Sequence, residues 1–295
     1  STLSVSPVLT SPGQPKVAVS AAGDATVVWQ STTAGGLKAQ AVRVSAAGKV
    51  GAVKVLGSGS EPDFMPAGAL AQVAATPAGV ATIAWNESGL NVRAVRMDAK
   101  GNLGKTITVA AGDPMDGTLK VNSIASGTST LVWSNSEPGS YQLNYAHISA
   151  AGKVGPVRVT GRLDTTETAL ATAPNGISTV IWARFTGETS GVQAVHFDTL
   201  DRTSPWSQLD GSTAEGMEPA VAVSPKGIST LAWSSQTSQK RAIRIQRFDL
   251  RNRMTSIATL TDSEVDHRNP SVATAPNEAS SVAWVTWSGV DNTSG

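Results

Sequence analysis

Apolar residues occur along the chain in short runs separated by turns that contain glycine, often with proline. The first two runs are Lys16–Ser20 and Thr26–Trp29, and Ala22-Gly23 between them predicts a tight turn. The second run has consecutive apolar residues, Val27-Val28-Trp29, which is typical of a strand buried on both faces. The two runs therefore predict a β-hairpin whose second strand lies inside the protein.

The hairpin recurs, because its second strand follows the motif Gly-x-x-Thr-x-x-Trp. The spacings between successive tryptophans are 56, 48, 49, 51 and 51 residues. The six motif tryptophans are Trp29, Trp85, Trp133, Trp182, Trp233 and Trp284. A third apolar run, a glycine turn and a short fourth run follow in most copies, as in Lys38–Val44, Gly48 and Ala52–Leu56. Each unit therefore predicts four antiparallel strands.

The length of the unit selects the architecture. Four-stranded units of about 50 residues are typical of β-propeller blades. Immunoglobulin-like arrays need about 100 residues per unit, and β-helices need much shorter coils. We therefore predict an all-β, six-bladed β-propeller that forms a single domain over residues 1–295. The blades are expected at about 15–57, 70–110, 118–160, 167–210, 218–261, and 269–295 together with 1–10.

Both ends of the repeat array depart from the pattern. The N-terminal run Ser4–Leu9 resembles a fourth strand, and we expect it to complete the sixth blade, since closure removes exposed strand edges. The sequence stops at Gly295, before a third strand of that blade. Either the blade lacks this strand or the chain has lost its C-terminal part, and we favour the second interpretation. Glu278 stands where the other copies have glycine, which puts the sixth hairpin turn in question.

Composition narrows the classes of partner and site. The formal net charge is +1 and there is no basic arm, so neither nucleic acid nor an anionic membrane is an expected partner. Cysteine is absent, which excludes disulfides, cysteine–zinc sites and thiol nucleophiles. No apolar run approaches the roughly 20 residues of a membrane-spanning helix. A Thr-, Ser- and Gly-rich composition with few lysines favours a secreted or cell-surface protein.

Carboxylates gather in the segments between blades, which open on one face of a propeller. Two positions recur in successive blades, as in Asp164/Glu167 and Glu215/Glu218. Three interpretations stay open: solubility and turn capping, a docking surface for a basic partner, or a cation site. Calcium is the ion that oxygen ligands would suit, although no Asp-x-Asp-x-Asp-Gly loop is present, and no other cofactor is expected. The candidate ligand-binding carboxylates are Asp63, Asp113, Asp116, Asp164, Glu167, Glu215, Glu218 and Asp266.

Two other groups of side chains are candidates for chemistry. We expect the motif tryptophans to pack in the core, and also Trp206, whereas Trp287 is the better candidate for an exposed aromatic that stacks on a sugar. A cation recurs in the third strand, where we expect pairing with the neighbouring blade or exposure to solvent. Two adjacent histidines in this set leave a metal pair open. The set is Arg43, Arg96, His147, His196 and Arg247.

The repeat unit carries a resemblance. The pattern Val-Ala-Val-x-x-x-Gly-x-x-Thr-x-x-Trp, followed by Gln-Ala-Val-Arg-Val and a glycine turn, resembles repeats of secreted bacterial propellers, notably from high-GC bacteria. The resemblance implies a scaffold or lectin-like protein and no particular activity, because propellers host lectins, scaffolds and hydrolases. No Gly-x-Ser-x-Gly elbow, His-Glu-x-x-His motif or P-loop is present.

Three functions remain open from the sequence. The leading prediction is a non-enzymatic extracellular binding module that recognises a carbohydrate or cell-surface polymer through its loop face. The first alternative is a protein-interaction scaffold whose acidic rim binds a basic protein. The second is a glycoside hydrolase-like enzyme with its site at the central channel, since carboxylates are plentiful.

Overall fold

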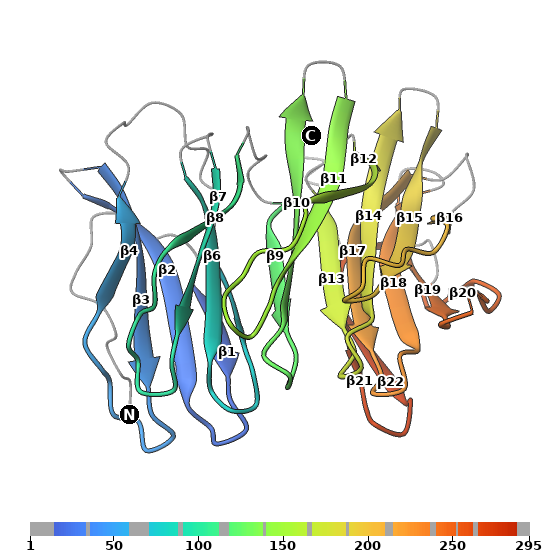
Figure 1. Cartoon of the computed structure of the whole chain (residues 1–295). Coiled ribbons are helices and arrows are strands. Elements are labelled where there is room, and N and C mark those ends of the chain that lie inside the picture. Colours follow the sequence, from blue (N-terminus) through green and yellow to red (C-terminus); the bar gives the residue numbers. More distant parts are fainter. Residues whose placement is uncertain are drawn as a thin grey trace, which may run out of the picture. The chain divides into compact units, whose positions relative to one another are not determined.

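The computed structural model describes residues 15–33, 36–58, 71–87, 91–111, 118–137, 140–163, 167–186, 189–209, 215–236, 240–251, 253–261 and 265–287. These residues form β-strands and turns (Figure 1). Within these ranges no helix has the length and apolarity needed to span a membrane. The chain forms two compact units, Ser1–Gly161 and Arg162–Gly295.

The first unit contains three antiparallel sheets, each of four strands in chain order (Figure 1). The first sheet consists of β1 (Lys16–Val19), β2 (Ala25–Thr33), β3 (Gly36–Val44) and β4 (Lys54–Ser58). The second consists of β5 (Gln72–Ala75), β6 (Ala81–Glu87), β7 (Asn91–Met97) and β8 (Ile107–Ala111). The third consists of β9 (Lys120–Ser123), β10 (Ser129–Glu137), β11 (Ser140–Ile148) and β12 (Arg158–Leu163).

The second unit repeats this arrangement. The fourth sheet consists of β13 (Thr168–Thr172), β14 (Ser178–Thr186), β15 (Thr189–Phe197) and β16 (Ser207–Gln208). The fifth consists of β17 (Glu215–Val223), β18 (Ser229–Gln236), β19 (Arg241–Phe248) and β20 (Ala258–Thr259). The sixth contains β21 (Asp266–Thr274) and β22 (Ser280–Trp287). The expected four-stranded repeat is thus confirmed in five sheets, and the N-terminal run Ser4–Leu9 lies outside the described residues.

A residue with left-handed backbone closes the turn before each motif strand. In five described copies it is glycine, with φ between 85° and 88°, as in Gly176 (φ 88°). The sixth copy uses Glu278 with φ 70°, and its turn keeps the same hydrogen bonds, Glu278 N–H to Ala275 O and Ala275 N–H to Ala279 O. The doubt about the sixth turn is therefore resolved, although Glu278 adopts a conformation that costs about 1–2 kcal/mol for a residue with a Cβ.

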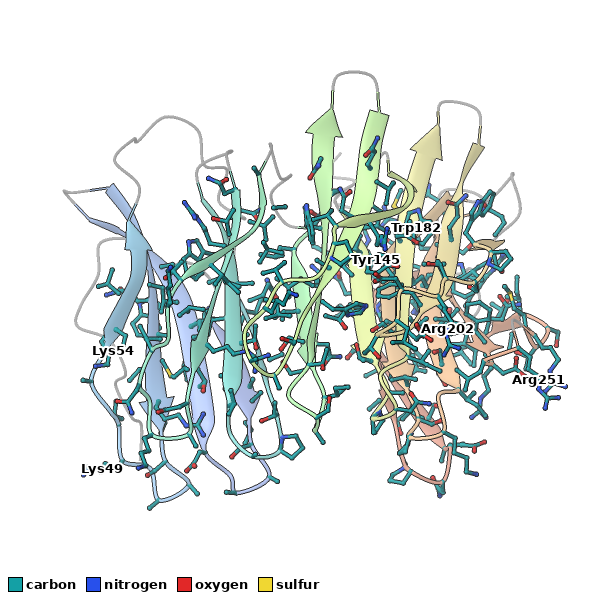
Figure 2. All side chains as sticks on the ribbon, in the orientation of Figure 1. Lys49, Lys54, Tyr145, Trp182, Arg202 and Arg251 are labelled. Carbon is teal, nitrogen blue, oxygen red and sulfur yellow. The ribbon has the colours of Figure 1, made fainter. Side chains whose placement is uncertain are left out.

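Five of the six motif tryptophans lie in the core, as expected from the sequence, whereas Trp284 is 38% exposed, so the expectation is wrong for the sixth copy. Trp133, Trp182 and Trp233 are fully buried, and Figure 2 shows side chains filling the space between neighbouring sheets within each unit. Trp133 packs with residues of both the second and the third sheet, and Trp233 does the same between the fourth and the fifth. Burial of one such indole stabilises the fold by roughly 4–6 kcal/mol on the basis of its area.

Hydroxyl groups of the motif join successive sheets beside these tryptophans. The motif Thr of one sheet bonds to the Ser that precedes the motif hydroxyl residue of the next sheet: Thr82 to Ser129, Thr179 to Ser229 and Thr230 to Ser280, at oxygen–oxygen distances of 2.7, 2.6 and 2.7 Å. Because both partners lie on strands that face another sheet, each hydroxyl satisfies the other where water is largely excluded. This explains why a polar residue stays in an otherwise apolar strand.

The recurrent arginines of the third strand also reach the next sheet. Arg43 donates to the carbonyl oxygen of Gly79 at 2.8 Å, Arg96 to that of Gly127, and Arg247 to that of Glu278 at 2.6 Å. Each acceptor is the left-handed residue of the neighbouring turn. The expected pairing with the neighbouring blade is thus confirmed for all three arginines.

Histidine replaces arginine at this position in the third and fourth sheets. His196 is buried, its Nδ1 lies 2.8 Å from the Thr179 hydroxyl, and its ring stacks on Phe248 with centroids 3.8 Å apart. Burial lowers the pKa of His196 to about 4, against an opposing contribution from Asp249. His196 is therefore a neutral core residue at physiological pH.

The left-handed turn predicts a difference between two substitutions at Gly176. Gly176→Val should lower the free energy of unfolding by about 2 kcal/mol, whereas Gly176→Asn should lower it by under about 1 kcal/mol, because asparagine tolerates positive φ. Chemical denaturation of the two variants measures this difference. Equal stabilities would mean that the backbone at this turn is not constrained as described.

The buried His196 predicts acid sensitivity. Its folded pKa of about 4 lies below the unfolded value of about 6.5, so the unfolded chain takes up the proton first as the pH falls. The stability contributed by neutral His196 is fully present above about pH 6.5. As the pH falls to about 4, the free energy of unfolding decreases by an amount on the order of 2 kcal/mol. Urea unfolding at pH 7 and pH 4.5 should therefore show a smaller loss for His196→Gln than for the unchanged protein, and parallel losses would contradict the assignment.

Candidate functional site

The structure describes four of the candidate binding residues with their side chains, and all four are in the second unit. These are Glu167, Glu218, Asp266 and Trp287. The other candidates, Asp63, Asp113, Asp116 and Asp164, lie outside the described residues, as does the side chain of Glu215. The candidate site is therefore built from the ends of the fifth and sixth sheets.

A β-bulge shapes the start of both sheets. The register shifts between Met217 and Ala220 in β17, and between Arg268 and Ser271 in β21. Inside these bulges Glu218 and Asn269 have φ of 53° and 51°. A bulge leaves a backbone N–H without a partner in the ladder, and such a group needs another acceptor.

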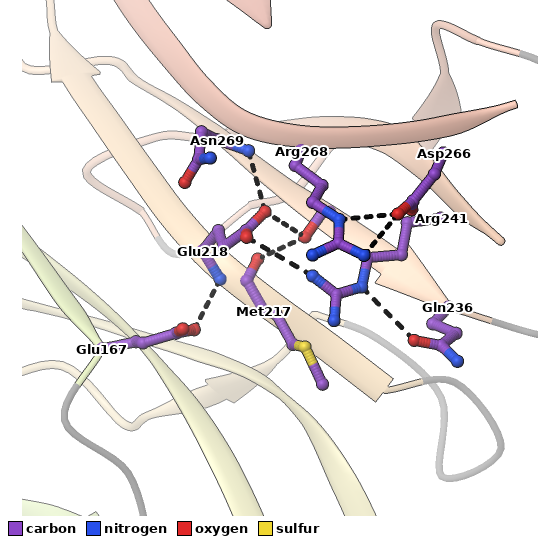
Figure 3. Close-up of polar contacts among 9 residues, drawn as sticks. Glu167, Met217, Glu218, Gln236, Arg241, Asp266, Arg268 and Asn269 are labelled. Carbon is purple, nitrogen blue, oxygen red and sulfur yellow. Dashed lines mark hydrogen bonds and ion pairs between the residues drawn. The ribbon is translucent and has the colours of Figure 1, made fainter. Parts of the chain in front are cut away.

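A carboxylate from the preceding sheet supplies that acceptor. Glu167 Oε2 accepts the backbone N–H of Glu218 at 2.6 Å, and Glu218 Oε2 accepts the backbone N–H of Asn269 at 2.7 Å (Figure 3). The second of the two recurrent acidic positions thus joins one sheet to the next. This contact assigns Glu167 and Glu218 a structural role, close to the turn-capping interpretation of the sequence.

Glu218 makes further contacts within the fifth sheet. The Ser234 hydroxyl donates to Oε2 at 2.9 Å, and Arg241 Nη1 lies 3.3 Å from Oε1. Arg241 also donates through Nε to Gln236 at 3.3 Å. Both charged side chains are less than one-fifth exposed, so Glu218 is a partly buried acceptor whose bonding groups come from three strands.

Asp266, Arg268 and Trp287 form the second part of the cluster. Asp266 lies opposite Trp287 in the pairing of β21 with β22. Arg268 Nε donates to Asp266 Oδ2 at 2.6 Å, and its guanidinium carbon lies 5.9 Å from the centre of the Trp287 ring. Trp287 itself is 62% exposed. An exposed indole therefore stands beside an ion pair that offers both donors and an acceptor.

The charges of this cluster balance one another. Figure 3 shows the side chains of Arg241 and Arg268 extending from β19 and β21 towards the two carboxylates of Glu218 and Asp266. The hydrogen bond to Asp266 and the charges of Asp266 and Glu218 raise the pKa of Arg268, although partial desolvation opposes them. The two cations Arg241 and Arg268 thus lie beside the two anions Glu218 and Asp266. We call these four residues the four-charge cluster.

Among the described residues outside this cluster, hydrogen bonds lower the pKa of carboxyl groups. The Asn102 side chain lowers the pKa of Asp98, and the Arg253 backbone N–H does the same for Asp249. A general acid needs a pKa shifted in the opposite direction. Across the described ranges no group of three or more His, Asp or Glu residues is arranged to hold a metal ion.

Two further findings depart from the sequence expectations. Trp206 is 54% exposed, so the expectation that it packs in the core is wrong. Arg268 was missed, although it stands where the fifth sheet has Met217, and this departure from the repeat was a usable signal. A bulge, in contrast, has no clear mark in either sequence segment.

Comparisons with known proteins agree on the fold. No protein-family model and no curated protein sequence matches the chain. Among solved structures it is similar to the BP39L lectin from Burkholderia pseudomallei, with a TM-score of 0.60, 12% identity, and coverage of 89% of this chain and 78% of the lectin. It is also similar to the β-propeller domain of the Trilobed protease from Pyrococcus furiosus, with a TM-score of 0.54, 6% identity, and coverage of 96% and 83%.

A third similar structure is the Hadza microbial sialidase Hz136, with a TM-score of 0.50 and 12% identity. The comparison covers 90% of this chain but only 61% of the sialidase. At these identities the comparisons show the fold alone, and they place the repeated antiparallel sheets among β-propeller proteins.

The contacts of Glu218 predict a large loss of stability on truncation. Glu218→Ala should lower the free energy of unfolding by about 2–3 kcal/mol, because the bulge N–H of Asn269, the Ser234 hydroxyl and Arg241 all lose an acceptor. Glu218→Gln keeps one carbonyl oxygen and should cost less. Alanine and glutamine both pay the cost of positive φ at this position. The difference between the two variants in urea unfolding therefore reports the contribution of the acceptor oxygen. Equal losses of stability would contradict the structural role of Glu218.

Proposed function

We propose that this chain is a non-enzymatic carbohydrate-binding module in which Trp287, Asp266 and Arg268 contact the sugar. One observation carries the proposal: an exposed indole lies against an ion pair at the end of a rigid sheet. An indole offers an apolar face, on which the C–H groups of a sugar ring stack. The neighbouring guanidinium and carboxylate offer donors and an acceptor for its hydroxyl groups.

The repeat itself does not require a tryptophan at position 287. The motif tryptophans of the first five sheets are buried, and the sixth, Trp284, is 38% exposed, whereas Trp287 ends β22 three residues after Trp284 and is 62% exposed. The equivalent residue of the fifth sheet is Gln236, which bonds to Arg241. Trp287 is thus an addition to the scaffold, and it ends a strand that is exposed along most of its length.

The same contacts weigh against the alternatives. An acidic rim for a basic partner needs unpaired carboxylates, but Glu167, Glu218 and Asp266 all bind groups of the protein itself. A glycoside hydrolase needs a carboxyl group with a raised pKa, and the shifts resolved for Asp98, Asp198 and Asp249 are all downward. Similarity to a lectin supports carbohydrate binding, while similarity to a sialidase keeps carbohydrate processing as the second candidate.

The proposal includes a finer architecture and a location. We propose six blades, with Ser4–Leu9 as an added strand of the sixth, in a secreted or cell-surface bacterial protein. Six copies of the motif support the number of blades, and β22 pairs only with β21 among the described residues, which supports an added strand. The Thr-, Ser- and Gly-rich composition supports secretion.

Two exposed tryptophans provide a matched test of the site. Trp287→Ala should weaken binding to the best glycan from an array at least tenfold, since loss of a stacking platform removes about 1.4 kcal/mol or more. Trp206→Ala, which removes another exposed indole from the same unit, should leave the affinity unchanged. Titration calorimetry with the selected glycan measures both.

Two results would overturn the proposal. The first is a folded, unchanged protein that binds no glycan on a broad array. The second is an equal loss of affinity in Trp206→Ala and Trp287→Ala, which would place the site elsewhere or show non-specific adsorption to aromatic surfaces.

A further inference from the structure

The charges of the four-charge cluster indicate which class of sugar the site binds, on the premise that the proposed function holds. We infer that the ligand is an uncharged glycan, bound with the apolar face of one sugar ring on Trp287 and with hydroxyl groups on the Arg268–Asp266 pair. Uronate, sulfated and sialylated glycans are excluded as the preferred ligands. The inference depends on charge pairing, burial and the orientation of Trp287.

Both arginines of the cluster already have an anionic partner. Arg268 Nε and Nη2 lie 2.6 and 2.5 Å from Asp266 Oδ2, and Arg241 lies 3.3 Å from Glu218 Oε1. The hydrogen bond to Asp266 raises the pKa of Arg268, so the guanidinium stays cationic throughout the physiological pH range. A site for an anionic sugar would instead present a cation without an anionic partner, and the ligand would neutralise its charge.

An acidic ligand group would also lie near existing negative charge. Asp266 is opposite Trp287 in the strand pairing, so a sugar stacked on the indole comes close to the Asp266 carboxylate. Two like charges at about 4 Å repel by about 1 kcal/mol even in water, and by more where water is excluded. A hydroxyl group in the same place donates a hydrogen bond to the carboxylate and avoids this cost.

Arg268 fixes the orientation of the platform. Its guanidinium carbon lies 5.9 Å from the centre of the indole, within the range of a cation–π contact, while its Nε is held by Asp266. The cation therefore restrains the ring, and the guanidinium N–H groups that Asp266 does not accept are the proposed donors for sugar hydroxyls. Asp266 acts as a positioning residue for Arg268 as well as an acceptor.

The fifth sheet, which is the other copy described over these positions, lacks this combination. The fifth sheet has Glu215, Met217 and Gln236 at the positions of Asp266, Arg268 and Trp287. Both sheets have an acidic residue at the first of these positions. At the other two, the sixth sheet has the guanidinium of Arg268 and the indole of Trp287, where the fifth has a thioether and an amide. Such a joint change is expected when three side chains act on one ligand.

The test compares neutral and anionic glycans on the complete chain. The probes are an array of neutral gluco-, galacto-, manno-, xylo- and arabino-oligosaccharides beside oligogalacturonates, sulfated and sialylated glycans. We expect the strongest binding in the neutral set, with less than a twofold change in Kd between 50 and 500 mM NaCl. An anionic ligand would lose affinity steeply over that range, because salt screens its attraction.

One substitution reverses the expected preference. Asp266→Asn leaves Arg268 without its neutralising charge, so affinity for oligogalacturonate should rise about fivefold, as loss of about 1 kcal/mol of repulsion implies, while affinity for the neutral ligand falls. Asp249→Asn is the matched control, since its carboxylate pairs with Arg253 in the second turn of the fifth sheet. Thermal unfolding of both variants verifies that they are folded.

The outcomes separate the inference from the proposed function. Preference for neutral glycans together with the reversal in Asp266→Asn supports both. Preference for anionic glycans with steep salt dependence overturns the inference and leaves carbohydrate binding in place. Binding to no glycan overturns the proposed function, and the inference with it.

Discussion

Within each of the two units, the packing of one sheet against the next is the interaction on which the rest of the described structure depends. A four-stranded sheet of about 50 residues is too small to bury both faces by itself, so its stability comes from its neighbours. The second strand of each sheet carries this interface, which is why β18 is buried along nearly its whole length. A large indole at a fixed position in that strand fills the space between sheets, and the motif tryptophan is explained by this need alone.

Polar contacts give the interface its register. The Thr–Ser pairs, the arginine bonds to turn carbonyls and the carboxylate bonds to bulge N–H groups all run from one sheet to its successor. Apolar packing tolerates sliding, whereas a hydrogen bond at 2.6–2.8 Å requires one alignment. The left-handed turn residue has two functions here, because it closes its own hairpin and presents its carbonyl oxygen to an arginine of the preceding sheet.

The sequence predicted those features that depend on local pattern. Strand positions, the left-handed turns and the buried tryptophans follow from periodicity and from the conformational freedom of glycine. The role of Glu218 could not be predicted, because its acceptor function depends on a bulge in the next sheet, 51 residues away along the chain. Exposure of Trp206 was missed for a similar reason, since the covering of a short fourth strand depends on tertiary packing. Glu278 shows that the surrounding turn can impose a conformation that the residue disfavours by itself.

The chain combines a repeated scaffold with one place where the repeat is altered. We propose that a ligand contacts Trp287 and leaves the motif tryptophans untouched. The indole N–H signals of all eight tryptophans can be followed by nitrogen-edited NMR during titration with a neutral oligosaccharide. We predict a saturating shift of the Trp287 signal, with the signals of the five motif tryptophans from Trp29 to Trp233 unchanged. A saturating shift of one of those five, or of Trp206, with Trp287 unmoved would contradict the claim.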